Sequence, residues 1–243
     1  MQLTQKKSRR GDLLTAAAVA MLLAVMAALL YTGSLTRQVT NMLIPTAVYI
    51  VMAVSLNLVV GLLGELSLGH AGFMSAGLFS GCLVAIALTN TALPLMVRLP
   101  VSMLAGGLTA AVFGLLVGLP TLRLRGDYLA IVTLACGEII KNIITNLRVT
   151  GGALGLNTTA IYAGAKELLP YGAALVLLTV AVMLNLKRSK YGRAIMAIRD
   201  NRIAAESVGL SVTRYKLAVF VIAAFFACLL YTSPSPRDGL LSR

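Results

Sequence analysis

The chain alternates between long apolar stretches and short polar segments. A helix needs about 20 apolar residues to cross the hydrocarbon core of a bilayer. Stretches near that length predict about seven spans, at residues 13–31, 42–63, 67–88, 101–119, 127–147 and 168–186 and from 217 onward. The pattern therefore predicts an all-α fold, a polytopic bundle of membrane helices.

The last predicted span is the shortest. Residues 217–231 supply roughly 15 of the ~20 residues that a crossing needs. Pro234 and Pro236 follow, and proline cannot continue a helix. We therefore expect residues 1–231 to form one transmembrane domain that is truncated at its C-terminal end. Residues 232–243 are expected to be a non-native or disordered tail.

Composition agrees with a membrane protein. Hydrophobic residues make up 58% of the chain and charged residues 12%, about half of the usual share of roughly 25%. The net charge of +13 could indicate nucleic-acid binding. The basic residues lie between the apolar stretches instead, where membrane topology requires them. Nucleic acid is therefore excluded as a partner, and the lipid bilayer is the expected environment.

The distribution of basic residues predicts the orientation. With alternating spans, the segments on the side of the N-terminus carry fourteen Lys and Arg residues. The opposite segments carry four, Arg37, Arg98, Arg148 and Lys166. Because basic loops stay in the cytoplasm, we predict a cytoplasmic N-terminus.

The polar segment 187–216 holds eight of the 21 basic residues and lies on the predicted cytoplasmic side. Residues 191–208 read as a short helix in which Ile195, Ile198 and Ala205 share an apolar face. Gly209 stands where a C-cap glycine would. The segment is either a basic surface loop that sets orientation and touches lipid head groups, or a docking element for a cytoplasmic partner.

A glycine-rich stretch at 61–77 contains Glu65, Ser67 and His70. Glycines there loosen the helix, and broken backbone at membrane depth is tolerated only against protein or a water-filled cavity. The three polar residues are therefore candidates for a translocation path. Alternatively, Glu65 lies at the interface while Ser67 and His70 satisfy backbone groups between helices.

A second polar set follows in residues 127–147. Thr133 is a further path candidate, and Glu138, Asn142 and Thr145 can share one helix face that lines the path. The alternative for Glu138 is a local ion pair with Lys141, three residues further on.

The sequence gives little support for a metal or catalytic centre. His70 is the sole histidine, which argues against a histidine-based cluster. The cysteines lie in apolar stretches without metal-ligand spacing, at Cys82, Cys136 and Cys228, and are expected to be small buried hydrophobes. No metal is predicted.

Four stretches carry a resemblance to a known family. They are GLLGELSLGHAGF, RLRGDYLAIVTLACGEI, TGGALGLN and YGRAIMAIRDNRIAAESVGLSVTRYK. Together they resemble the LivM-type permease subunit of bacterial branched-chain amino acid ABC importers. The resemblance implies a multi-pass protein of the bacterial inner membrane. Its implied partners are a second permease subunit, two cytoplasmic ATP-binding subunits and a periplasmic substrate-binding protein.

The late polar segment resembles the coupling motif of ABC permeases, E-A-A-x-x-x-G. Ala204, Ala205 and Gly209 match it, whereas Ile203 replaces the acidic residue. The resemblance implies that this segment couples to the ATPase. The expected coupling residues are Tyr191, Gly192, Arg193, Ala197, Arg199, Ala204, Ala205 and Gly209.

No phosphate-binding loop of the form G-x-x-x-x-G-K-S/T is present. We therefore expect no cofactor in this chain, no enzymatic activity of its own, and ATP bound by partner subunits. One alternative is an ABC permease for another small polar cargo, such as a sugar, urea or an amide. A proton- or sodium-driven carrier that uses Glu65 and Glu138 as relays is less favoured. An intramembrane enzyme is improbable because the motifs H-E-x-x-H and G-x-S-x-G are missing.

Overall fold

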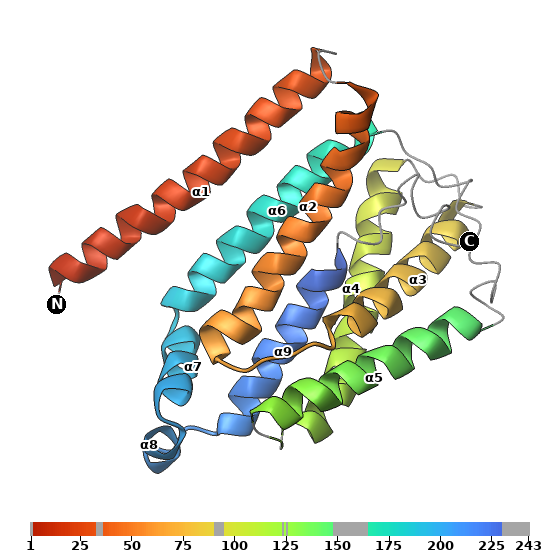
Figure 1. Ribbon diagram of the computed structural model, residues 1–243. Coiled ribbons are helices and arrows are strands. Elements are labelled where there is room, and N and C mark those ends of the chain that lie inside the picture. The colour runs from red at the N-terminus through yellow and green to blue at the C-terminus, as the bar shows by residue number, and fades with distance from the viewer. Residues whose placement is uncertain are drawn as a thin grey trace.

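The computed structural model describes residues 2–32, 36–89, 95–122, 124, 126–147 and 165–229. Helices make up almost all of these ranges, and no strand occurs in them (Figure 1). The helices are α1 (Gln2–Tyr31), α2 (Arg37–Asn57), the π-helix η1 (Leu58–Leu63), α3 (His70–Thr89), α4 (Leu95–Thr121), α5 (Asp127–Asn146), α6 (Ala165–Arg188), α7 (Lys190–Asp200), α8 (Arg202–Ser207) and α9 (Val212–Leu229).

Six helical segments in the described ranges are long and apolar enough to cross a membrane. They are Gln38–Leu63, His70–Thr89, Met96–Thr121, Asp127–Asn146, Leu168–Arg188 and Val212–Leu229. The prediction of an all-α, polytopic membrane bundle is confirmed. The first predicted span falls on α1, whose apolar part, Thr15–Leu30, is shorter than the other six.

Helix α9 lies at the centre of the bundle, where it contacts α2, α3 and α4. Figure 1 shows α5 next to α3 on one side, and α6 and then α1 beyond α2 on the other. Along α9, small and aromatic residues alternate in the core, and Phe220, Ala223, Ala224 and Cys228 are at most 1% exposed. Small residues let neighbouring helices approach α9 closely in the absence of a hydrophobic force between them.

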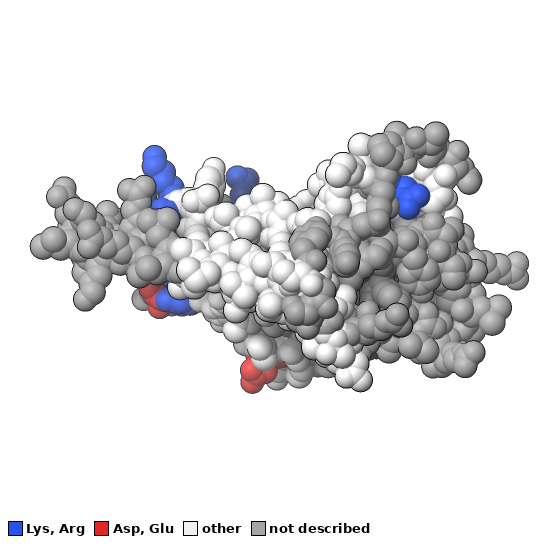
Figure 2. Space-filling model, turned by 90° about the horizontal axis from the view of Figure 1, so that it is seen from above, with Lys and Arg blue, Asp and Glu red and all other residues white. Residues whose placement is uncertain are grey.

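The predicted cytoplasmic segments lie at one end of the bundle. In Figure 1 the α4–α5 turn and the helices α7 and α8 are at the lower end, and α1 begins on the same side as α7, at the left of the picture. Seen from above, most of the described surface is uncharged, and the few visible charged side chains lie mostly in the left half (Figure 2). This is the half in which α7 and α8 lie in Figure 1. The arrangement agrees with the predicted alternation of spans.

The last span begins earlier than predicted. Helix α9 starts at Val212 instead of residue 217 and has 18 residues, which gives a length of roughly 27 Å. The prediction counted Lys216 among the basic residues of the polar segment 187–216. Lys216 is only 6% exposed and forms an ion pair with Glu65, so its charge does not end the span.

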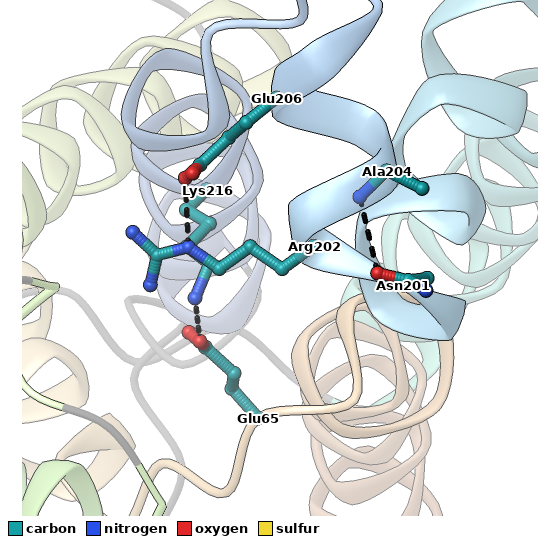
Figure 3. Close-up of polar contacts among 6 residues, drawn as sticks. All are labelled: Glu65, Asn201, Arg202, Ala204, Glu206 and Lys216. Atoms are coloured by element: carbon teal, nitrogen blue, oxygen red, sulfur yellow. Dashed lines mark hydrogen bonds and ion pairs between the residues drawn. The ribbon is translucent and has the colours of Figure 1, made fainter.

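The single helix predicted over residues 191–208 is two helices. Asn201 has φ −153° and ψ 103°, which separates α7 from α8. Its side-chain Oδ1 accepts a hydrogen bond of 3.1 Å from the Ala204 N–H (Figure 3). Asparagine is among the best N-cap residues because its oxygen satisfies a free N–H of the first turn. Asn201 therefore begins a second helix.

Two predicted features lie outside the described residues. They are the glycine-rich TGGALGLN stretch at 150–157 and the tail at 232–243.

Candidate functional site

The chain breaks its helical path between α2 and α3. At the end of α2 the backbone widens into η1, and the N–H groups of Gly64 and Glu65 both bond to the Val59 carbonyl oxygen. Gly64 has φ +76°, a left-handed conformation that is readily adopted only by glycine. Residues 64–69 then form a non-helical connection up to the start of α3 at His70.

Arg199 of α7 completes the end of η1. In a continuous α-helix, the Gly61 carbonyl would accept a hydrogen bond from the Glu65 N–H, which here points to Val59. Arg199 Nη1 donates to the Gly61 oxygen instead, at 2.8 Å. A Cβ on Gly64 would lie 2.5 Å from Arg199 Cγ, so the arginine covers the turn directly. The helix pair α7 and α8 is thereby joined to the end of a membrane span.

A second contact joins the connection to α9. Glu65 Oε1 accepts from Lys216 Nζ, and the two side chains are 15% and 7% exposed (Figure 3). The other carboxylate oxygen, Oε2, is buried and has no hydrogen-bond partner within the described protein. Buried ion pairs depend on both partners, because either charge alone is costly in a medium of low dielectric.

The far half of the connection packs on α5. The Leu68 N–H donates to Thr133 Oγ1 at 3.2 Å, and Thr133 is completely buried. Helices α3 and α5 approach each other very closely at two glycines, because a Cβ on Gly72 would lie 2.5 Å from Gly137 Cα. Thr133 of α5 therefore contacts the same connection that carries Glu65.

Ser67 and His70 are also buried at this connection, at 2% and 4% exposure. Ser67 Oγ and both ring nitrogens of His70 have no hydrogen-bond partner within the described protein. The imidazole packs edge-on against Phe73 and Phe220. Buried polar atoms normally have partners, so these three atoms stand out among the described residues of the connection.

The other path candidates lie on a different face. Glu138 and Asn142 are exposed on α5, while Thr133 and Gly137 face α3. Glu138 is paired with Lys141 at 3.6 Å, and Thr145 Oγ1 bonds to the Lys141 carbonyl oxygen. The structure thus brings Glu65, Ser67, His70 and Thr133 together and places Glu138, Asn142 and Thr145 apart from them. The local ion pair considered for Glu138 is present.

The expected coupling residues divide into inward and outward groups. Ala205 is buried with Ile198 and Val212, as the predicted apolar face requires, so it faces this chain. Gly192 is also buried, whereas the remaining six are exposed, namely Tyr191, Arg193, Ala197, Arg199, Ala204 and Gly209. The most exposed apolar residues at this end are Ile203 and Val208, at 81% and 82%. Ile203 stands at the acidic position of the motif and Val208 at one of its variable positions, so neither was among the expected coupling residues.

Helix α8 ends in a glycine cap. Gly209 has φ +87°, its N–H bonds to the Glu206 carbonyl, and the Leu210 N–H bonds to the Ala205 carbonyl at 3.1 Å. This pair of bonds is the Schellman motif. A Cβ on Gly209 would meet nothing within 4 Å, so the requirement for glycine is conformational only.

Replacing Gly209 with alanine should lower the free energy of unfolding by about 1 kcal/mol, because alanine resists a positive φ. Gly209→Asn should cost less, since asparagine tolerates the left-handed region. Thermal unfolding of the purified protein in detergent measures both. Equal losses for the two variants would point to steric contact instead of backbone strain.

Several comparisons place the chain among known proteins. The family described as "Branched-chain amino acid transport system / permease component" matches residues 38–230. The "High-affinity branched-chain amino acid transport system permease protein LivM" of Salmonella typhimurium is 36% identical over 81% of this chain and 52% of its own length. The protein of the same name from Escherichia coli gives the same values.

A "Probable branched-chain amino acid transport permease protein LivM" of Methanocaldococcus jannaschii is 29% identical over 47% of this chain and 36% of its own length. No solved structure matches the chain. The chain spans about half the length of the two bacterial relatives. With a family match over most of its residues, the chain belongs to the family of branched-chain amino acid transport permease components.

Proposed function

We propose that this chain is the membrane permease subunit of a bacterial ABC importer for branched-chain or other neutral amino acids. It would lie in the inner membrane and work with a second permease subunit and a periplasmic substrate-binding protein. Two cytoplasmic ATPase subunits would bind ATP, so the chain itself needs neither a cofactor nor an enzymatic site. Its family and the names of its relatives support this proposal.

The observation that carries the proposal is the pair of exposed apolar residues at the two ends of α8, Ile203 in its first turn and the C-cap residue Val208. Ile203 and Val208 are more than four-fifths exposed at the end that is predicted to be cytoplasmic, with the small Ala204 between them. A large apolar side chain gains about 1.5–3 kcal/mol when it is buried. A short helix with a small apolar face fits a groove on a soluble partner, and an ATPase subunit is the partner that the family implies.

Two contacts provide a route by which an ATPase could move the membrane spans. Arg199 holds the Gly61 carbonyl at the end of η1, and Lys216 holds Glu65 in the connection. A shift of α7 and α8 would therefore move the α2–α3 connection, in the manner of small helix shifts at subunit interfaces. Ser67 and His70 are buried in or next to that connection, so movement of the connection would also move these two candidate path residues.

Cargo other than an amino acid is the main alternative. A sugar, urea or another amide would use the same coupling route, so only transport measurements separate them. The alternative of an ion-driven carrier gains little from the structure, because Glu65 is engaged by Lys216 and Glu138 by Lys141.

The proposal is tested by placing an acid at each of these two exposed positions in the transporter assembled with its partner subunits. Ile203→Glu and Val208→Glu should each reduce co-purification of the ATPase and ATP-driven leucine uptake into vesicles by at least tenfold. A buried unpaired carboxylate at the interface costs several kcal/mol. Ser211→Glu adds the same charge at a neighbouring exposed position and should change neither quantity.

Uptake is also measured for a sugar and for urea, and with an ion gradient in place of ATP. Normal ATPase retention in both α8 variants would show that this face does not dock the ATPase. Uptake that follows an ion gradient without ATP would contradict the ABC mechanism.

A further inference from the structure

A cavity of about 250 Å³ lies where α7 meets the ends of α2 and α6. Its wall is apolar on the side of the membrane spans, with Val54 from α2, Met183 from α6 and Met196 from α7. Three polar side chains complete it, Asn57, Lys187 and Arg199. In Figure 1 this junction lies at the lower end of the bundle, where α6 continues into α7.

The polar rim of the cavity is positively charged. Lys187 is exposed and has no ion-pair partner within the described ranges. Arg199 uses three of its N–H groups for Gly61 and Asp200, which leaves two of five for a ligand. Residues 187–200 contain five basic residues and a single acid. The rim therefore favours an anion with several acceptor oxygens, such as a phosphate.

The cavity joins this cationic rim to an apolar wall at the level where membrane spans end. Lys187 is in the last turn of α6, and Asn57 is the last residue of α2. Free phosphate would contact the rim but gain nothing from Val54 and Met183. A phospholipid head group can contact both the cationic rim and the apolar wall. Its phosphate lies at the interface, and its glycerol and first methylene groups lie just below.

We propose that this cavity binds the head group of an anionic phospholipid from the cytoplasmic leaflet. Its phosphate oxygens accept hydrogen bonds from Lys187 Nζ and from the remaining N–H groups of Arg199, while its glycerol region contacts the apolar wall. The volume is slightly below the roughly 300–1,000 Å³ of pockets for drug-sized ligands. It therefore holds a head group and leaves the acyl chains in the bilayer.

This lipid would touch the arginine that completes the end of η1. Arg199 donates to the Gly61 carbonyl and lines the cavity with the same guanidinium group. A bound phosphate would hold that guanidinium at the junction of α2 and α7. The lipid thus becomes a structural part of the contact between the cytoplasmic helices and the membrane span.

The test measures lipid retention. The full chain is reconstituted in equimolar phosphatidylcholine and phosphatidylglycerol, extracted in mild detergent, and analysed for bound lipid by native mass spectrometry. Phosphatidylglycerol should be retained in preference to phosphatidylcholine. Lys187→Gln should lower this retention about fivefold, the effect of one basic contact to an anionic lipid. Lys190→Gln removes a charge that is also exposed but does not line the cavity, and it should leave retention unchanged.

Equal losses in the two variants would show that general surface charge attracts the lipid, and would overturn the site. A competition arm adds glycerophosphate, which has the phosphate but no acyl chains. Displacement of phosphatidylglycerol by glycerophosphate at equal concentration would assign the cavity to a soluble phosphate ester instead. None of these measurements depends on the ATPase or on transport, so their failure and the failure of the proposed function are distinct.

Discussion

Replacing Lys216 with methionine should lower the free energy of unfolding by roughly 3–5 kcal/mol, the usual cost of removing one partner from a buried ion pair. Methionine fills a similar volume, so the loss comes from the charge on Glu65, which is 15% exposed and has no other partner within the described protein. Denaturant titration of the purified protein in mixed micelles measures the change.

Two further variants separate this effect from simple loss of packing. The double variant Glu65→Leu with Lys216→Met removes both charges and should recover most of the stability, because no buried charge is left. Lys141→Met breaks the half-exposed pair with Glu138 and should cost less than about 1 kcal/mol. A double variant no more stable than Lys216→Met would show that the ion pair is not the cause.

Replacing Gly72 with valine should cost about 3 kcal/mol and separate α3 from α5. The Cβ of any residue at this position would lie 2.5 Å from Gly137 Cα and 2.6 Å from the Gly137 oxygen. Backbone atoms cannot rotate away as a side chain can, so the helices must move apart, and overpacking of this kind typically costs 1–3 kcal/mol or more. The same denaturant titration measures the loss.

Ala71→Val is the matched control, because Ala71 is the preceding residue of α3 and is exposed. It adds the same side chain to the same helix without an α5 contact and should change stability by less than about 0.5 kcal/mol. If Gly72→Val and Ala71→Val are equally stable, the close approach of α3 and α5 is wrong.

The helices of the bundle could be predicted because each must bury its own backbone hydrogen bonds in a bilayer, which leaves a long apolar stretch as its signal. The start of α9 could not be predicted from such a stretch. Lys216 reads as a boundary residue in any local pattern, and the residue that neutralises it is 151 positions away in the chain. The break at Asn201 has a local signal, because asparagine favours the N-cap position, but the prediction rested on the apolar face of Ile195, Ile198 and Ala205 and continued one helix through it.

Part of the candidate site could also be predicted from the sequence. Glu65, Ser67 and His70 stand out as polar residues among glycines, and the structure places Thr133 with them. Their role in transport stays a prediction. The Arg199–Gly61 contact could not be predicted from the sequence, because its acceptor is a backbone carbonyl that any residue could supply. Ala205 was expected at the docking surface, but which side of a small helix faces a partner depends on tertiary packing.

The Arg199–Gly61 hydrogen bond has a consequence for synthesis on the ribosome. The two residues are 138 positions apart, and translation at about 5–20 residues per second separates their appearance by roughly 7–28 s. The interval between the synthesis of Glu65 and that of Lys216 is longer still, because these residues are 151 positions apart. During that interval the end of η1 and the carboxylate must be solvated by water or by the insertion machinery. The connection between α2 and α3 is therefore completed only after α7 and the first turns of α9 have been made, which makes it a late step of biogenesis.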